Sequence, residues 1–351
     1  MKIVYSYGVF DFFEKELKFI ESQSNGEVEI IPFNHRKFLD WPGDVSPLEL
    51  DNFYRNGHTR LFELYKYIDE LCENADVFYV DHECVYHPDF ILSLSKKIYT
   101  VIYSGDDPES SYRRSKPYLY AFDHSFCYGV YHNINQKMTE KFLEWGAQRA
   151  NFKPYGCMQE MYNHDLTEYD ILNGNREIDM IFVGGYANST RNDFLLRLKK
   201  HYREKFQIYG GWGGFVGFLS RIKNGHGLIK INKITNEQLL EKYKKSKIGI
   251  NIHQSFGPCN LRMYELPMNG VMQICDNEKG LNDIFKINEE VVSYSTYDEI
   301  IEKINYYLDN DDLRRQIAVN GFRKAKRLYQ FHTTFLDSLP LILNGIKEKS
   351  K

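Results

Sequence analysis

A short helix-like segment, "NLRMYELPMNG", carries an arginine and a glutamate three residues apart, Arg262 and Glu265, just before an apolar run. Residues at i and i+3 share one face of a helix, so both side chains would reach the same ligand. A carboxylate in that position can accept both hydroxyls of a ribose, and a guanidinium can bind a diphosphate. The alternative is an intrahelical pair that stabilises the helix by a few tenths of a kcal/mol.

Glycines end two apolar runs that precede this segment. In "FVGGYANSTRND" (182–193) and "IYGGWGG" (208–214) they would let backbone N–H groups approach an anion, and a following helix would add partial positive charge. Each run taken alone is equally consistent with an ordinary turn between a strand and a helix. The candidate ligand contacts of these two loops are Gly184, Gly185, Arg191, Gly210, Gly211 and Trp212.

A third strand-like run, 247–253, ends in His253 and leads through a Gly-Pro turn to Asn260 and the Arg/Glu segment. Parallel strands point their carboxyl ends at one cleft, so three such ends together indicate a ligand site better than any one of them. The G-x-G-x-x-G fingerprint of dinucleotide sites is absent, which disfavours a dehydrogenase.

Apolar runs of strand length alternate with helical patterns along most of the chain, which predicts doubly wound α/β domains with parallel sheets. A polar stretch at 156–177 divides the alternation into two halves, and we expect a ligand in the cleft between them. The expected strands are 2–7, 27–33, 76–80, 98–104, 124–130, 178–185, 206–211, 247–253, 271–276 and 290–294; the expected helices include 60–73, 136–146 and 236–245, and a long helix that bends near 332–334 before a last helix.

Composition supports a globular protein without a special charge bias. The chain of 351 residues is 42% hydrophobic and 26% charged, with a net charge of −3, so neither disorder nor nucleic-acid binding is expected. The six cysteines are scattered, as in reduced cytosolic proteins, and show no zinc-like clustering. No run approaches the roughly 20 apolar residues of a membrane span.

The first half offers carboxylates rather than glycines. Asp106 and Asp107 follow the strand expected over 98–104, and one of them could orient an acceptor hydroxyl or act as its base. The alternative, which we favour for at least one of them, is a turn or cap residue before Pro108. The run "DHECVYH" (81–87) would form a polar cleft wall rather than a metal site, because histidines at i and i+5 in a loop are weak evidence of a metal.

The second half resembles GT-B glycosyltransferases of the family 4-like, CgeB-like group. The segments that carry the resemblance lie in the family's order between about 178 and 335, and include "IFVGGY", "IYGGW", "YKKSKIGINIH", "NLRMYELPMNGVMQICD" and "GLNDIF". The first half is similar only through "YSGDDPE" and "KFLEWGAQRANFKPYG".

The resemblance implies a nucleotide-diphosphate sugar, of the UDP or GDP series, bound mainly by the second domain. Glu265 would hold the ribose, with His253, Asn260, Arg262, Tyr264 and the glycines around the donor. Many family members carry a second glutamate eight positions earlier, but Gly257 stands there in this chain. The carboxylate on the side of the donor sugar is therefore missing, and the stereochemical outcome stays open.

The sequence therefore predicts a GT-B fold with an N-terminal acceptor domain (1–160), a linker (161–177), a nucleotide-sugar domain (178–330) and a C-terminal helix (331–351) packing back on the first domain. The expected activity is sugar transfer to a hydroxyl of a surface glycan or a lipid-linked acceptor, without a metal or another cofactor. The expected location is the cytoplasm, at the inner face of the membrane if the basic residues 323, 324, 326 and 327 contact lipid; a solvated basic face is the default. Two alternatives are a nucleotide-sugar epimerase and a non-catalytic nucleotide-sugar-binding protein.

Overall fold

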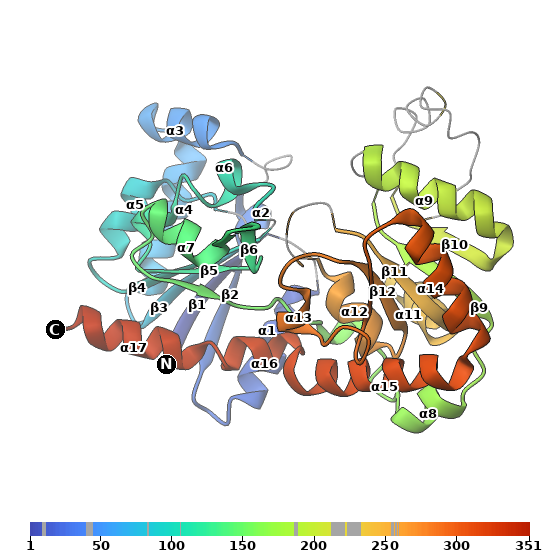
Figure 1. The fold of residues 1–351 in the computed structure, drawn as a ribbon. Coiled ribbons are helices and arrows are strands. Elements are labelled where there is room, and N and C mark those ends of the chain that lie inside the picture. The colour runs from blue at the N-terminus through green and yellow to red at the C-terminus, as the bar shows by residue number, and fades with distance from the viewer. Residues whose placement is uncertain are drawn as a thin grey trace. The chain divides into compact units, whose positions relative to one another are not determined.

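The computed structural model describes residues 1–351 apart from 9–11, 40–44, 83, 106, 186–188, 212–221, 223–232, 254, 255, 257 and 259. The chain divides into two compact units. Unit 1 comprises residues 1–155, 255–259 and 331–351, and unit 2 comprises residues 156–254 and 260–330. Figure 1 shows that both are α/β structures with helices packed around a twisted sheet. None of the helices in the described ranges is long and apolar enough to cross a membrane.

Unit 1 is built on a six-stranded parallel sheet with the order β2-β1-β3-β4-β5-β8. Its strands are β1 Lys2–Tyr7, β2 Glu29–Asn34, β3 Val77–His82, β4 Tyr99–Ser104, β5 His124–Cys127 and β8 Ala150–Phe152, and a separate hairpin joins β6 Tyr131–Asn133 to β7 Gln136–Lys137. Its helices are α1 Phe13–Gln23, α2 His35–Leu39, α3 Pro47–Arg55, α4 Thr59–Cys72, α5 Pro88–Leu94, α6 Ser111–Arg114, η1 Leu119–Ala121, α7 Met138–Glu144, α16 Phe331–Leu336 and α17 Leu339–Lys349.

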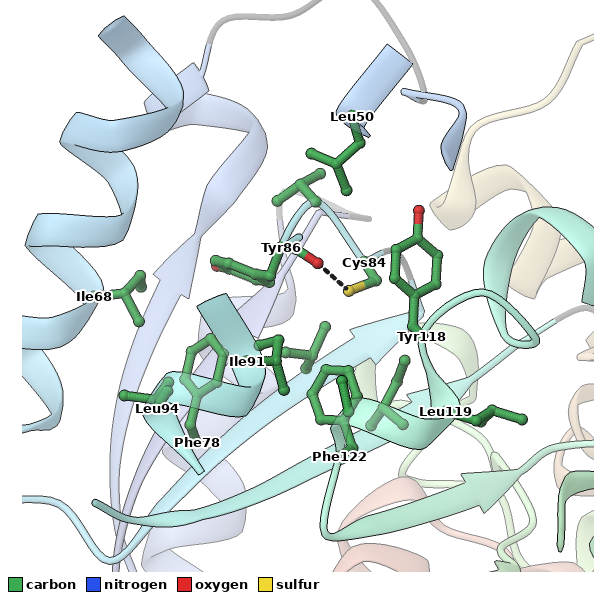
Figure 2. Close-up of a cluster of buried hydrophobic side chains, with 14 of the residues drawn as sticks. Leu50, Ile68, Phe78, Cys84, Tyr86, Ile91, Leu94, Tyr118, Leu119 and Phe122 are labelled. Atoms are coloured by element: carbon green, nitrogen blue, oxygen red, sulfur yellow. Dashed lines mark hydrogen bonds between the residues drawn. The ribbon is translucent and has the colours of Figure 1, made fainter. Parts of the chain in front are cut away.

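Successive side chains of a strand point to opposite faces, and this alternation gives the sheet of unit 1 two different faces. One face carries Phe78 and Val80 into an apolar core that Figure 2 shows between the sheet and the helices around it. In this core the Cys84 thiol donates to the carbonyl oxygen of Tyr86, at 3.4 Å. The other face is aromatic, and Tyr5 stacks on Tyr79 with 4.7 Å between ring centroids.

Unit 2 is built on a five-stranded parallel sheet with the order β10-β9-β11-β12-β13. Its strands are β9 Ile178–Val183, β10 Phe206–Tyr209, β11 Ser246–Asn251, β12 Met272–Asp276 and β13 Val292–Tyr294. Its helices are η2 Gln159–Met161, α8 Glu168–Asn173, α9 Ser189–Tyr202, η3 Arg203–Lys205, α11 Asn236–Lys244, α12 Arg262–Met268, α13 Leu281–Ile284, α14 Tyr297–Asp309 and α15 Asp311–Leu328.

Both sheets share one strand order. Counted along the chain within each unit, the second strand lies outside the first and the third lies on its other side, as in doubly wound folds. The order therefore reverses between β1 and β3 in unit 1 and between β9 and β11 in unit 2. Ligands of such folds bind at the carboxyl ends of the strands beside this switch point.

The C-terminal residues differ from the expected pair of helices. The long helix α15 ends at Leu328, and α16 and α17 follow as separate helices, so the break lies at 329–330 rather than at 332–334. Both short helices belong to unit 1, where Lys349 of α17 bonds to Asp123 at 2.7 Å. The five described cysteines, Cys72, Cys84, Cys127, Cys157 and Cys275, are all buried.

Candidate active site at the switch point of unit 2

The site begins where β9 and β11 end, at Val183 and Asn251. Helix α12 follows β11 in the chain and sits close to it because β11 contains Gly249. A Cβ atom at Gly249 would lie 2.4 Å from Cδ2 of Leu266, so only glycine allows this approach. The close packing brings the first turn of α12, which carries Arg262 and Glu265, to the strand ends.

Arg262 connects the two strands of the switch point. Its Nη1 donates to the carbonyl oxygen of Val183 (2.8 Å) at the end of β9. Its Nη2 donates to the carbonyl oxygen of Ile252 (3.2 Å), and its Nε donates to Oδ1 of Asn251 (3.2 Å), both at the end of β11. The guanidinium also lies 4.7 Å from the ring centroid of Phe182. A guanidinium has five N–H donors, and the described residues accept three of them, which leaves two that a ligand could use.

Glu265 shares the helix face of Arg262, but the two do not form an ion pair in the described part of the chain. Oε2 of Glu265 instead accepts a hydrogen bond from the Tyr243 hydroxyl of α11, at 3.3 Å. Burial raises the pKa of the Glu265 carboxyl, although the charge of Arg262 and the Tyr243 hydroxyl lower it. Burial lowers the pKa of Arg262, against the effect of Tyr243 and Glu265. The alternative of a simple intrahelical pair therefore does not describe these residues.

The glycines after β9 and β10 allow the two loops to pack against each other. The N–H of Gly184 donates to the carbonyl oxygen of Tyr209 (3.0 Å), and a Cβ at Gly184 would lie 2.4 Å from Nη1 of Arg262. Gly210 has a φ of 135°, and a Cβ there would lie 2.0 Å from the carbonyl oxygen of Gly184. Gly185 and Gly211 are less constrained. Among the described residues, the nearest atom to a Cβ at Gly185 is 3.7 Å away, and none lies within 4 Å of a Cβ at Gly211.

Two further predicted residues lie beside these loops. Arg191 is buried in the first turn of α9, and its Nη2 donates to the carbonyl oxygen of Gly185 at 2.5 Å. Asn260 donates through Nδ2 to Oδ1 of Asn251 (2.9 Å) and accepts the N–H of Met263 (3.1 Å), so it fixes the start of α12 to the end of β11. Both residues thus order the loops around the switch point.

His253 is held by an aspartate of the neighbouring strand. Its Nδ1 lies 2.7 Å from Oδ1 of Asp276, and its backbone N–H donates to Oδ2 of the same carboxylate (2.9 Å). Burial alone would raise the pKa of Asp276, but the charge and hydrogen bonds of His253 outweigh burial, and the pKa is lowered. The carboxylate therefore fixes both the backbone and the ring of His253.

The remaining predicted donor residues are placed differently. Tyr264 is fully buried, and its ring packs 5.3 Å from that of Tyr329, because it lies on the core face of α12 rather than on the face of Arg262. Trp212 lies outside the described residues. Asn251, Tyr243 and Asp276 were not predicted from the sequence. Of these, Asn251 carried a signal as a polar residue near the end of the apolar run "IGINI".

Asp106 and Asp107 of unit 1 were predicted to orient the acceptor hydroxyl or to act as its base. Asp106 lies outside the described residues. Asp107 is fully buried, and its Oδ1 accepts hydrogen bonds from the hydroxyls of Ser111 and, at 2.7 Å, Ser115. These bonds tie Asp107 to α6, as the alternative of a turn and cap residue describes, and its role as a base stays a prediction.

The run 81–87 provides buried groups rather than an open wall. Asp81 is 2% exposed and accepts the Tyr5 hydroxyl at 2.6 Å, and burial raises its pKa. On the same side of the sheet, Lys153 is 2% exposed, with its Nζ 4.1 Å from the ring centroid of Tyr103. Burial lowers the pKa of Lys153 to about 8, although Asp81 raises it. His87 stacks on Tyr54 at 3.9 Å between ring centroids, so it is a packed residue.

The basic face of α15 is partly neutralised. Arg323 donates to Glu168 (Nε to Oε1, 2.7 Å), and Lys324 pairs with Glu290 at 2.9 Å. These pairs favour the default of a solvated face over a lipid-binding one.

Residues 191–335 match a family described as glycosyl transferase-like. A search of curated proteins by sequence finds no match. Among solved structures, the chain is similar to sucrose-phosphate synthase from Thermosynechococcus elongatus, at 11% identity and a TM-score of 0.66 over 98% of both chains. A glycosyltransferase from Rickettsia africae is similar at 14% identity, with a TM-score of 0.65 over 99% of this chain and 98% of that one.

The Anabaena protein HepE, solved in complex with UDP, is also similar, at 11% identity and a TM-score of 0.62 over 98% of this chain and all of that one. Identities this low establish the fold and not the activity. The fold is that of the GT-B class, with two Rossmann-like α/β domains, and the prediction of this fold class is confirmed.

Proposed function

We propose that the chain is a glycosyltransferase that moves a sugar from a nucleotide-diphosphate sugar to an acceptor hydroxyl. The proposal rests on one observation, which is that the segment matching the family also forms the candidate site. The segment that matches the glycosyl transferase-like family, residues 191–335, is the segment that brings Glu265 and Arg262 to the switch point of unit 2. A switch point is where doubly wound sheets bind nucleotides.

The proposed roles follow from the contacts of the two side chains. Glu265 would bind the ribose hydroxyls, and their hydrogen bonds would offset the burial that raises the pKa of its carboxyl. Arg262 would offer the diphosphate the two N–H donors that no described residue accepts, close to the backbone N–H groups of the glycine loops. The UDP series is the first choice, because a protein of the same fold has been solved with UDP, and the GDP series is the second.

The finer assignments belong to the same proposal. They are membership of the CgeB-like group, an acceptor in a surface glycan or on a lipid, transfer without a metal, and activity at the cytoplasmic face of a membrane. Asp106 or Asp107 would orient the acceptor hydroxyl. Transfer that continues in excess EDTA would support independence from metals, and activity that EDTA abolishes would contradict it.

The first experiment is a thermal-shift panel of nucleoside diphosphates and their sugars on the wild type, on Glu265→Ala and on Glu241→Ala. Glu241 is an exposed residue of α11 in the same unit, so its variant controls for the loss of a carboxylate. A ligand at about 100 times its Kd stabilises the folded state by roughly 2.7 kcal/mol. We expect one nucleotide series to stabilise the wild type and the control but not Glu265→Ala. No shift with any nucleotide would refute the donor site.

Product analysis separates the proposal from its two alternatives. An epimerase converts the nucleotide sugar without any acceptor, whereas a transferase releases the nucleoside diphosphate and lengthens an acceptor. A binding protein does neither, and it would not respond to Asp106→Asn or Asp107→Asn beyond a change in stability.

A further inference from the structure

Three side chains that bind metals in proteins meet at the ends of β11 and β12. The two strands pair so that Asn251 lies opposite Cys275, which brings His253 next to Cys275 and Asp276. Nδ1 of His253 lies 2.7 Å from Oδ1 of Asp276 and 3.8 Å from Sγ of Cys275, and this Sγ lies 3.4 Å from the same Oδ1. The set therefore offers one nitrogen, one sulfur and one oxygen within a single cluster.

These separations are close to those of a tetrahedral zinc site. Bonds of about 2.0–2.1 Å to nitrogen, 2.3 Å to sulfur and 2.0–2.2 Å to oxygen place the ligand atoms roughly 3.4–3.6 Å apart. The two distances that involve Sγ, 3.8 and 3.4 Å, agree with this range to about 0.2 Å. The distance between nitrogen and oxygen is shorter by roughly 0.7 Å, as expected where a proton rather than a metal lies between them.

The hydrogen bond between His253 and Asp276 has an explanation without a metal, because the carboxylate orients the ring. The thiol of Cys275 is fully buried and donates to the same Oδ1, so the three ligand atoms are already gathered before a metal binds. The imidazole of His253 can also carry its proton on Nε2 instead of Nδ1. Within the described part of the chain, Nε2 of His253 has no hydrogen-bond partner, so it can carry the proton when Nδ1 binds a metal.

The geometry points to a binding site for a thiophilic divalent cation of the zinc type, held by Nδ1 of His253, Sγ of Cys275 and the carboxylate of Asp276. One thiolate and one imidazole select Zn²⁺ over Mg²⁺ and Ca²⁺, which prefer oxygen ligands. On binding, the thiol releases its proton to solvent and the ring proton moves from Nδ1 to Nε2. Zn²⁺ binding is measured without a nucleotide, so its outcome is separate from that of the proposed donor site, to which His253 was also assigned.

Zinc binding to the full-length protein tests this directly. The protein is treated with EDTA, desalted and titrated with Zn²⁺ in competition with a chromophoric chelator. We expect one Zn²⁺ per chain, and an affinity lower by about tenfold or more in Cys275→Ser and in Asp276→Asn. Cys157→Ser is the control, because Cys157 is a buried cysteine of the same unit outside the cluster, and it should bind as the wild type does. Equal binding by all three variants would overturn the assignment.

A second measurement does not depend on the stability of a variant. Co²⁺ added to the wild type should produce the near-ultraviolet absorption of a thiolate–cobalt bond and the intense visible bands of tetrahedral cobalt. Excess Zn²⁺ should abolish both, while Mg²⁺ at the same concentration should not. A wild type that binds neither Zn²⁺ nor Co²⁺, or that binds Co²⁺ without the thiolate absorption, would refute the site.

Discussion

Replacing Arg262 by lysine separates two roles of this residue, as a connection between strands and as a contact for the donor. Lysine keeps the positive charge, but its single ammonium cannot reach all three acceptors that the planar guanidinium binds on β9 and β11. If the connection matters, the variant loses stability even without a nucleotide. If only the charge matters, the variant is as stable as the wild type.

The expected magnitude follows from the contacts that are lost. At least two of the three hydrogen bonds disappear, and each bond from a charged group contributes about 1–2 kcal/mol at this partly buried position. We therefore expect the free energy of unfolding to fall by about 2–4 kcal/mol. For a domain of 150–250 residues each kcal/mol shifts Tm by about 2–4 °C, so the Tm should fall by roughly 5–15 °C.

The assay is heat-induced unfolding followed by calorimetry, with the Kd for UDP measured by titration at a temperature where both proteins are folded. Arg197→Lys is the matched control, because Arg197 is exposed on α9 and stacks on the ring of Tyr297 at 3.9 Å. It should change stability by less than about 0.5 kcal/mol. A Tm for Arg262→Lys equal to that of the control would refute the connecting role, and an unchanged Kd for UDP would refute the role in donor binding.

Three further substitutions test other parts of the structure. Gly184→Ala should destabilise the protein by about 1–3 kcal/mol and weaken nucleotide binding, because its Cβ would meet a guanidinium nitrogen at 2.4 Å. Gly211→Ala should be tolerated in the same thermal-shift assay, because no atom of the described residues lies within 4 Å of its Cβ. Lys153→Met should flatten the pH dependence of stability. The pKa of Lys153 is about 8 in the folded state and near 10.5 in the unfolded state, so between these pH values the unfolded state binds one more proton. The stability of the wild type should therefore rise by up to about 3 kcal/mol from pH 8 to pH 10.5. Urea unfolding should show this rise in the wild type and not in the variant. Asp107→Asn should lower the free energy of unfolding by about 1–3 kcal/mol, because a buried acceptor of two hydroxyls is weakened; activity lost at an unchanged Tm would show instead that the carboxylate is catalytic.

The strands were the most predictable part of the fold. Lys2–Tyr7 matches the expected bounds, and β9, β11 and β12 each lie within about two residues of the expected ranges, because long apolar runs of strand length have few alternatives in a parallel sheet. The strand Ala150–Phe152 was missed, since three residues give no periodic pattern. Gly146, with a φ of 98°, follows α7 closely, in the left-handed conformation that often ends a helix.

The sequence indicated which strand ends carry the candidate site residues, but not the contacts that those residues make. The short helix with Arg262 and the glycines after two of the strands indicated which strand ends come together, because the carboxyl ends of parallel strands always lie at one edge of a sheet. Two of the three partners of Arg262 are backbone carbonyl groups, which no residue type reveals. The pairing of His253 with Asp276 depends on the register of β11 and β12, and the register is set by the packing of the whole sheet.

The buried cysteines allow the stability of the wild type to be measured by chemical labelling, without an added probe. A thiol that is closed to solvent reacts with an alkylating reagent only when the structure around it opens, so its labelling rate measures the free energy of that opening. Cys72, Cys84 and Cys127 belong to unit 1, while Cys157 and Cys275 belong to unit 2. Mass spectrometry of the labelled peptides would therefore follow the opening of each unit separately, and a nucleotide that slows labelling in unit 2 more than in unit 1 would identify the unit that binds it.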